Sequence, residues 1–452
     1  MMKKAIVFVM GALMLAALLA VTMPRKKESI SEPDDVVTSE TVSEQTELQS
    51  DEEVQVVQKI GYQASNPENI KAMWLSQFDM SSVYSNDRQQ RTRQDYQVLL
   101  ERVLDRVVET GINTVIVQVR PYMDSMYPSE YYPMSKFVVG EYGKEAVYDP
   151  FEILIEEAHE RGLAVHAWIN PLRGMLTDEI LRIDDKYPVK RFYTDREKRG
   201  TLLVEFQDRW YLNPAYEEAR SLIVDGAREI LLNYDVDGLH MDDYFYPSGC
   251  TDAFDEKAYI DYIKNVERVS LQAFRRSRVN TLVRELYAMV KETNETVLFG
   301  ISPGGNMKTN YNNLGADVYT WCAEEGYIDY ICPQVYWGME HETYDFVSVC
   351  KTFDEMIKVD SIRLVIGMTV SKAKSGYDQY AGTGQWEWRD HKDVLYRCLQ
   401  HTQTLKHCVG VSYFCYQYFY DPLTGVSVRA TEAERDLFVP LLKEIQWNTT
   451  DG

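Results

Sequence analysis

Short apolar runs alternate with longer segments of helical period along most of this chain. In YQVLLERVLDRVVETG (96–111) and DPFEILIEEAHERG (149–162), apolar residues recur three and four positions apart, which predicts helices. Gly111 suits the end of the first helix, and Asp149 with Pro150 suits the start of the second. Eight apolar runs predict strands, at residues 71–79, 112–121, 163–171, 236–245, 296–305, 328–337, 363–370 and 409–418.

Eight strand and helix units in succession predict an α/β fold, a (β/α)8 barrel of the TIM type. No Gly-x-Gly-x-x-Gly follows the first run, so a dinucleotide crevice in an open sheet has no support. Long βα loops are expected after strand three (172–213) and strand four (247–295). The first contains a predicted hairpin around TLLVEFQDRWYL, and the second ends in a predicted amphipathic helix, RVNTLVRELYAMVKE. Because βα loops form the catalytic face of a barrel, we expect a site there.

The N-terminal part of the chain has a different composition. Residues 1–27 combine MMKK, an apolar stretch and PRKK, which predicts a signal peptide or a membrane anchor. Residues 28–62 are rich in Ser, Thr, Glu, Asp, Val and Gln and predict a disordered acidic tether. The barrel domain is then expected at 63–452. This order predicts an extracytoplasmic protein of the cell envelope, membrane-anchored or secreted, that contacts the membrane through its N-terminal segment.

Charge and composition limit the classes of binding partner and cofactor that we expect. A formal net charge of -22 repels a phosphate backbone, so we expect no nucleic acid partner. Aromatic residues make up 12% of the chain, and their flat rings suit the faces of sugars. Seven cysteines lie between Cys250 and Cys415 without metal-like spacing, which leaves one disulfide open for an exported protein. We expect no metal ion and no cofactor, because no His-x-x-x-His or His-Glu-x-x-His occurs.

The fourth run ends in paired carboxylates, in VDGLHMDDYFYP (236–247). Alternation along a strand places His240, Asp242 and Tyr244 on one face and Asp243 on the other. An inward acid at a barrel mouth is costly unless it has a use. We therefore expect Asp242 to be the catalytic carboxyl group of the pocket and Asp243 to have a supporting role.

Nearly all of the remaining predicted strands also end in polar or aromatic residues. Amides and acids at these positions suit the hydroxyl groups of a polyol, and rings suit its apolar faces. The predicted substrate-binding residues are Asp79, Gln118, Arg120, Trp168, Asn170, Arg173, His240, Tyr244, Ser302, Asn306, Gln334, Tyr336 and Trp337.

A glycosidase needs a second carboxyl group, so that one donates a proton and the other acts as nucleophile or base. Asp124 and Glu340 are the first candidates because both stand among aromatic residues. Asp317 and Asp79 are further candidates, and Asp243 is one if the strand twists as it ends.

Several of these stretches together resemble the glycosyl hydrolase-like family 10, exported bacterial TIM-barrel proteins distantly similar to the α-amylase superfamily. The resemblance is carried by MWLSQFD, GINTVIVQVRPYMDSMYPSEYYP, LAVHAWINP, WYLNP, VDGLHMDDYFYP, FRRSRVNTLVRELY, FGISPGGN, GYIDYICPQVYWG and LVIGMTV. It implies hydrolysis of bacterial cell-wall polysaccharide, in particular peptidoglycan strands stripped of their peptides. Asp242 would then be the nucleophile or base.

The fourth strand also resembles the α-amylase nucleophile motif, Gly-Phe-Arg-x-Asp. Gly238 and Asp242 match its glycine and aspartate, whereas Leu239 replaces the aromatic residue and His240 the arginine. α-Amylases carry their acid after strand five, where this chain reads ISPGGN, so the partner acid lies elsewhere or is absent.

Two arginines fit a wall glycan. Arg120 ends the second predicted strand and Arg173 follows the third, and two guanidinium groups suit the lactyl carboxylate of a muramic residue without its peptide. Two other functions stay open: a non-catalytic glycan-binding barrel, and a hydrolase of another polysaccharide such as an α-glucan.

Overall fold

The computed structural model of this protein describes residues 61–447. The predicted leader or anchor at 1–27 lies outside the described residues, and so does nearly all of the predicted tether. Within 61–447, no helix is both long and apolar enough to cross a membrane.

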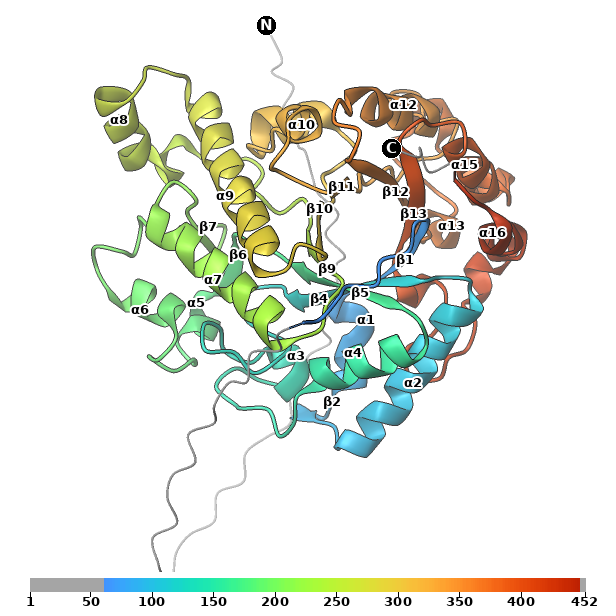
Figure 1. The fold of residues 1–452 in the computed structure, drawn as a ribbon, viewed down its shortest axis with the longest axis horizontal. Coiled ribbons are helices and arrows are strands. Elements are labelled where there is room, and N and C mark those ends of the chain that lie inside the picture. Colours follow the sequence, from blue (N-terminus) through green and yellow to red (C-terminus); the bar gives the residue numbers. More distant parts are fainter. Residues whose placement is uncertain (1–60, 448–452) are drawn as a thin grey trace, which may run out of the picture. The chain divides into compact units, whose positions relative to one another are not determined.

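Eight parallel strands close into a barrel, so the predicted fold is confirmed (Figure 1). Strand order around the barrel follows chain order, and the first strand pairs with both the second and the last. Each strand coincides with one of the eight predicted runs, although β1 and β13 begin one residue earlier than predicted. The strands are β1 (Ile70–Leu75), β4 (Thr114–Arg120), β5 (Ala164–Ile169), β9 (Gly238–Met241), β10 (Leu298–Ile301), β11 (Tyr330–Ile331), β12 (Arg363–Thr369) and β13 (Cys408–Phe414).

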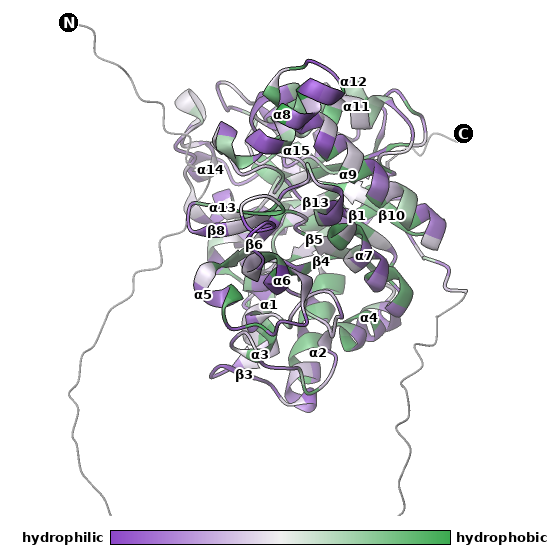
Figure 2. Cartoon of the chain, turned by 90° about the vertical axis from the view of Figure 1, so that its left-hand side faces the viewer, coloured by the Kyte–Doolittle hydropathy of each residue, from purple (hydrophilic) through white to green (hydrophobic). Residues whose placement is uncertain are grey.

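Helices surround the barrel, with α7 against α9 and α15 against α16 (Figure 1). The longer ones are α2 (Arg93–Glu109), α4 (Pro150–Glu160), α7 (Glu217–Asn233), α8 (Glu256–Asn265), α9 (Leu271–Thr293), α12 (Phe346–Met356), α15 (Val394–Thr402) and α16 (Glu432–Glu444). The shorter ones are α1 (Gln77–Tyr84), α3 (Lys136–Val139), α5 (Thr177–Ile180), α6 (Pro188–Thr194), α10 (Met307–Asn313), α11 (Val318–Ala323), α13 (Ser371–Ser375) and α14 (Glu387–Asp390). Hydrophobic and hydrophilic stretches alternate along these elements (Figure 2), and the apolar residues of the strands are buried.

The predicted ends of two helices are confirmed. Asp149 caps α4, accepting hydrogen bonds from the backbone N–H groups of Phe151 and Glu152 at 2.9 and 3.2 Å. Gly111 follows α2 with φ +87°, and a Cβ there would lie 2.6 Å from Cγ of Lys443. The left-handed backbone and the close neighbour both require glycine at this position.

The long loop after β5 forms a small antiparallel sheet of β6 (Arg173–Leu176), β8 (Arg209–Leu212) and β7 (Leu203–Phe206). Its β7–β8 hairpin was predicted from the sequence, and it turns at Gln207 and Asp208, which have φ of +52° and +63°. The loop after β9 contains α8 and ends in α9, the predicted amphipathic helix. Both elaborations follow the carboxyl ends of strands and therefore belong to the mouth of the barrel. A separate two-stranded sheet is formed by β2 (Ser85–Asn86) and β3 (Gln89–Gln90).

Candidate active site

Asp242 follows directly after β9 and is 2% exposed. Its Oδ2 accepts hydrogen bonds from Trp168 Nε1 at 3.0 Å and from the Asn170 side-chain amide. Its Oδ1 accepts one from the backbone N–H of Tyr244 at 3.1 Å. Burial, followed by the charge of neighbouring Asp243, raises the pKa of Asp242 well above its ordinary value, although these donors oppose the shift. Asp242 is thus a fixed carboxyl group with a strongly raised pKa.

A chain of amides sets the orientation of Asn170. Gln118 Nε2 donates to Asn170 Oδ1 at 2.6 Å, which leaves the Asn170 amide nitrogen pointing at Asp242. The other end of the Gln118 side chain accepts from the backbone N–H of Gln77 at 3.0 Å. Gln118 therefore acts on Asp242 only through Asn170.

Asp243 lies at the mouth too, contrary to the expectation that it faces away. Strand β9 ends at Met241, so the alternation that separates neighbouring side chains stops before the two aspartates. Gln334 Nε2 donates to Asp243 Oδ1 at 3.0 Å and to the carbonyl oxygen of Ser302 at 3.1 Å. Burial raises the pKa of Asp243 as well. Asp243 is half-buried, more open than Asp242.

Arg173 lies beside both aspartates, since its charge lowers the pKa of each against the larger effect of burial. Its guanidinium carbon lies 4.3 Å from the ring centre of Tyr244 and 4.8 Å from that of Tyr122. The guanidinium carbon of Arg209, from the β7–β8 hairpin, lies 4.5 Å from the same ring centre of Tyr122. Arg173 acts on the two aspartates through its charge, without a direct ion pair among residues 61–447, and Arg209 donates to the carbonyl oxygen of Gly174 at 2.5 Å. Sequence reasoning missed Tyr122 and Arg209, although RPYMD and DRWYL lie in loops of the expected face.

The predicted aromatic residues have different surroundings. Tyr244 is 44% exposed, whereas Trp168 is buried, with its ring edge-on to Trp74 at 4.8 Å. Burial raises the pKa of Tyr336 most, and the charges of both nearby aspartates raise it further. Trp337 is half-buried and stacks on Tyr344 at 5.0 Å. Tyr244 and Tyr336 are the rings best placed for a bound sugar.

Arg120 does not reach the mouth, which corrects the predicted arginine pair. The register between β4 and β5 shifts between Gln118 and Arg120, so the alternation breaks there. The guanidinium lies over the ring of Tyr132 at 4.7 Å, donates to the carbonyl oxygen of Ile223 in α7 at 3.5 Å and is 1% exposed. It packs in the helix layer.

Two predicted acids are enclosed within the fold. Asp79 accepts hydrogen bonds from the backbone N–H groups of Ser76 and Gln417 at 2.7 and 2.8 Å, capping α1. Asp124 accepts from the backbone N–H of Tyr122 at 2.7 Å and from the Tyr142 hydroxyl at 2.9 Å. Both aspartates are 0% exposed, so neither reaches a substrate. The sequence could not show this, because the partners come from a cap and a loop that form only on folding.

The remaining predicted residues are held in local structure. Glu340 is exposed, with His391 as its ion-pair partner at 3.6 Å. Asn306 caps α10 and donates to the Tyr344 hydroxyl at 2.9 Å. Asp317 caps α11 by accepting from Thr320. None of the three has a described contact with Asp242 or Asp243.

His240 and Ser302 are buried below the mouth. His240 Nδ1 contacts the Tyr330 hydroxyl at 2.6 Å inside the barrel, and burial lowers the pKa of this histidine well below its ordinary value. The Ser302 side chain is buried beside the thiol of Cys332. His240 therefore supports the barrel interior as a neutral ring.

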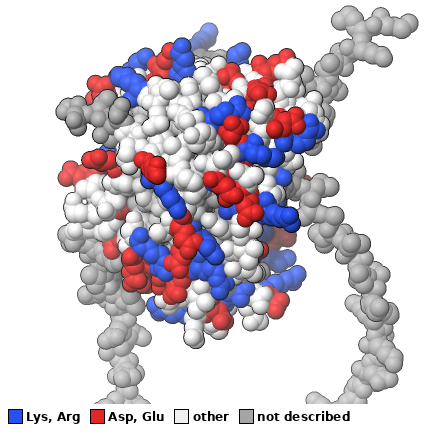
Figure 3. Space-filling view, turned by 90° about the vertical axis from the view of Figure 1, so that its right-hand side faces the viewer, with Lys and Arg blue, Asp and Glu red and all other residues white. Residues whose placement is uncertain are grey.

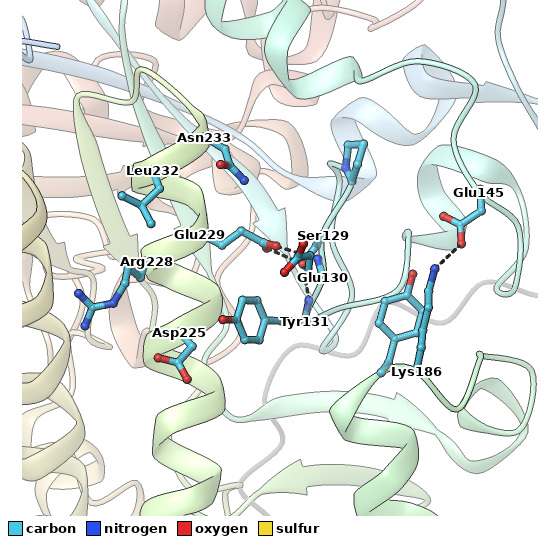
Figure 4. A pocket seen from close by; sticks show the side chains of 12 residues that line it. Ser129, Glu130, Tyr131, Glu145, Lys186, Asp225, Arg228, Glu229, Leu232 and Asn233 are labelled. Carbon is cyan, nitrogen blue, oxygen red and sulfur yellow. Dashed lines mark hydrogen bonds and ion pairs between the residues drawn. The ribbon is translucent and has the colours of Figure 1, made fainter. Parts of the chain in front are cut away.

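A surface pocket of about 460 Å³ lies apart from these carboxylates, between α7 and the loop after β4 (Figure 4). Its Glu229 accepts from the Ser129 hydroxyl and from the backbone N–H of Glu130 at 2.7 Å, and Lys186 pairs with Glu145 at 3.0 Å. Glu229 is thus held by the loop and Lys186 by Glu145, on the outside of the barrel, so we place the candidate active site at the mouth instead.

Within the described residues, no group of three or more His, Cys, Asp or Glu side chains could hold a metal ion. All seven cysteines fall in this part of the chain and are unpaired. On the face turned to the viewer in Figure 3, acidic and basic residues are intermixed.

The chain is similar to known proteins of one family. Residues 69–382 match the family described as Glycosyl hydrolase-like 10. Glycosyl hydrolase YngK of Bacillus subtilis (strain 168) is 34% identical over 295 residues, 61% of this chain and 56% of YngK. Glycosyl hydrolase DigH of Escherichia coli (strain K12) is 29% identical over 337 residues, 69% of this chain and 74% of DigH. The chain thus spans little more than half the length of YngK.

A solved structure shares the fold. The glycoside hydrolase domain of PgaB (BpsB) from Bordetella bronchiseptica has a TM-score of 0.51 at 12% identity and covers 82% of this chain and 98% of that domain. At this identity the likeness concerns the fold, and it agrees with the barrel described above. Because the family match extends over more than half of the chain, this protein belongs to the glycosyl hydrolase-like 10 family, as its sequence motifs indicated.

Proposed function

We propose that this protein is an extracytoplasmic glycoside hydrolase that cleaves bacterial cell-wall glycan strands whose peptides have been removed. The family supports a glycosidase, and the names of YngK and DigH agree with it. The observation that carries the chemistry is Asp242, a buried carboxyl group held by three donors at the barrel mouth. The N-terminal segment of the protein would keep the barrel at the outer side of the membrane.

The surroundings of Asp242 suit the hydrolysis of a glycosidic bond. This reaction develops positive charge on the sugar ring, and a carboxylate fixed next to the anomeric carbon stabilises that charge. The donors from Trp168, Asn170 and Tyr244 hold the group in place without a substrate. Burial also raises the pKa of the neighbouring Asp243, which is the direction of shift that a general acid needs.

Arg173 and Arg209 support the choice of substrate. In a chain with a net charge of -22, the guanidinium groups of Arg173 and Arg209 both lie over the ring of Tyr122, and Arg173 is also close to the two aspartates. A muramic residue without its peptide carries a free lactyl carboxylate, which is a bidentate partner for arginine. This pair replaces the one predicted from the sequence, in which Arg120 stood in place of Arg209.

Purified protein incubated with peptide-free glycan strands tests the proposal. New reducing ends should appear with the wild type and be lost with Asp242→Asn, while thermal unfolding verifies that the variant is folded. Binding of the strands without cleavage would favour a non-catalytic glycan-binding barrel. Cleavage of an α-glucan but not of the strands would favour a hydrolase of another polysaccharide.

A further inference from the structure

Carboxyl groups in the loops of the barrel mouth fall into two classes. Most are engaged in the fold: Asp79 and Asp124 are enclosed, Asp317 caps a helix, Asp378 pairs with Lys372, and Glu387 accepts from the backbone N–H groups of Met339 and Glu340. Glu340, in the loop after β11, is exposed and pairs with His391 at 3.6 Å, without a described contact with either aspartate. Among the described residues, Asp242 and Asp243 lie beside each other at the mouth, with Arg173 next to them.

We propose that Asp242 and Asp243 are together the catalytic pair, and that the 2-acetamido group of the substrate itself is the nucleophile. This inference rests on the proposed function and deepens it, because it restricts the cleaved bond to one that follows a 2-acetamido sugar. Neighbouring residues in a chain cannot stand on opposite faces of one sugar ring, as the usual retaining or inverting pairs do. A nucleophile supplied by the substrate removes that requirement.

The two aspartates are equipped for different roles. Asp242 has both oxygens bound by protein donors and is 2% exposed, so its position is fixed. It orients the acetamido group by accepting a hydrogen bond from its N–H. Asp243 is more open, and Gln334 binds only its Oδ1, which leaves Oδ2 free to face a leaving oxygen. Burial of two neighbouring carboxyl groups raises the pKa of both, which favours a proton held by the pair, and the more open Asp243 is the one placed to transfer it.

The reaction balances with these groups and one water molecule. The acetamido carbonyl oxygen bonds to the anomeric carbon as the glycosidic bond breaks, and Asp243 gives its proton to the departing oxygen. Asp242 stabilises the positive charge that forms on the resulting oxazolinium ring. Water then adds to the anomeric carbon, Asp243 takes back a proton, and the ring opens to the acetamide. Two displacements leave the anomeric configuration retained.

Peptide-free strands with and without their N-acetyl groups test the inference. We expect the wild type to cleave acetylated strands and to lose at least 100-fold in rate on de-N-acetylated strands, with the retained anomer released, as read by NMR. Release of the other anomer, or cleavage of de-N-acetylated strands at a similar rate, would contradict the inference. A wild type that cleaves no strand at all would instead refute the proposed function.

Variants separate the two roles. Asp243→Asn should lose at least 100-fold in kcat on the strands but much less on a 2-acetamido glycoside with a nitrophenol leaving group, which needs no proton. It should also lose the alkaline limb of the pH profile. Asp242→Asn should lose activity on both substrates. Asp360→Asn is the matched control, because this side chain is 97% exposed before β12, at the opposite end of the barrel. Equal losses for the two site variants on both substrates would contradict the assignment.

Discussion

Gln118 donates to Asn170 at 2.6 Å and so fixes which end of that amide faces the catalytic carboxyl group. Asn170 in turn donates to Asp242. Gln118, two strands away and without contact with Asp242, therefore sets the orientation of the Asn170 amide that binds this aspartate. This relationship makes Gln118 a positioning residue and gives the first prediction.

Gln118→Glu should lower kcat about tenfold, or about 1.4 kcal/mol of transition-state stabilisation, with little change in KM. The substituted side chain still accepts from Gln77, but it has no donor for Asn170, whose amide is then free to turn away from Asp242. Steady-state kinetics on peptide-free strands measure the effect. Gln403→Glu, on the surface, is the matched control. A rise in KM alone would contradict a positioning role.

Arg173→Gln and Arg209→Gln should each raise KM for peptide-free strands about tenfold, the order of a charge-assisted hydrogen bond. Neutral chitin oligomers carry no carboxylate, so their KM should change little. Competition between the two substrates gives the ratio directly. Equal losses on both would show that the arginines do not read a carboxylate.

Arg120→Gln should behave in the opposite way. Because Arg120 packs on Tyr132 and under α7, its loss should lower the thermal midpoint by a few degrees and leave KM for the strands unchanged. Calorimetry and kinetics on one preparation test both statements. A selective rise in KM for strands would show that Arg120 contributes to substrate binding and would contradict this prediction.

The aspartate pair should make stability depend on pH. Because the pKa of each is raised in the folded protein, the folded state binds more protons than the unfolded state above the ordinary pKa of 3.8. Their contribution to stability is present in full below that value and is lost as pH rises through the folded pKa values. Thermal midpoints of the wild type should therefore fall, relative to those of Asp242→Asn/Asp243→Asn, as pH rises from 4 towards 8. A constant difference would contradict the raised pKa values.

The sequence predicted the barrel because strand period and burial are local properties. All eight strands, the β7–β8 hairpin and the cap at Asp149 follow from neighbouring residues. Period-two alternation also placed Asp242 and Gln118 at the mouth, since both follow from the register of one strand.

The rest of the site depends on contacts that no local pattern shows. A register shift turned Arg120 towards the helices, and the end of β9 at Met241 brought Asp243 to the mouth. Arg209 reaches the site only because its hairpin folds back beside β6. Asp124 looked like a partner acid until the folded loop enclosed it.

The most direct measurement is the release of reducing ends from peptide-free wall glycan by the wild type and by Asp242→Asn, at equal concentrations of folded protein. Cleavage by the wild type and a loss of at least 100-fold in the variant is the predicted result. Equal release of reducing ends by the two proteins would contradict the central claim that Asp242 performs the reaction.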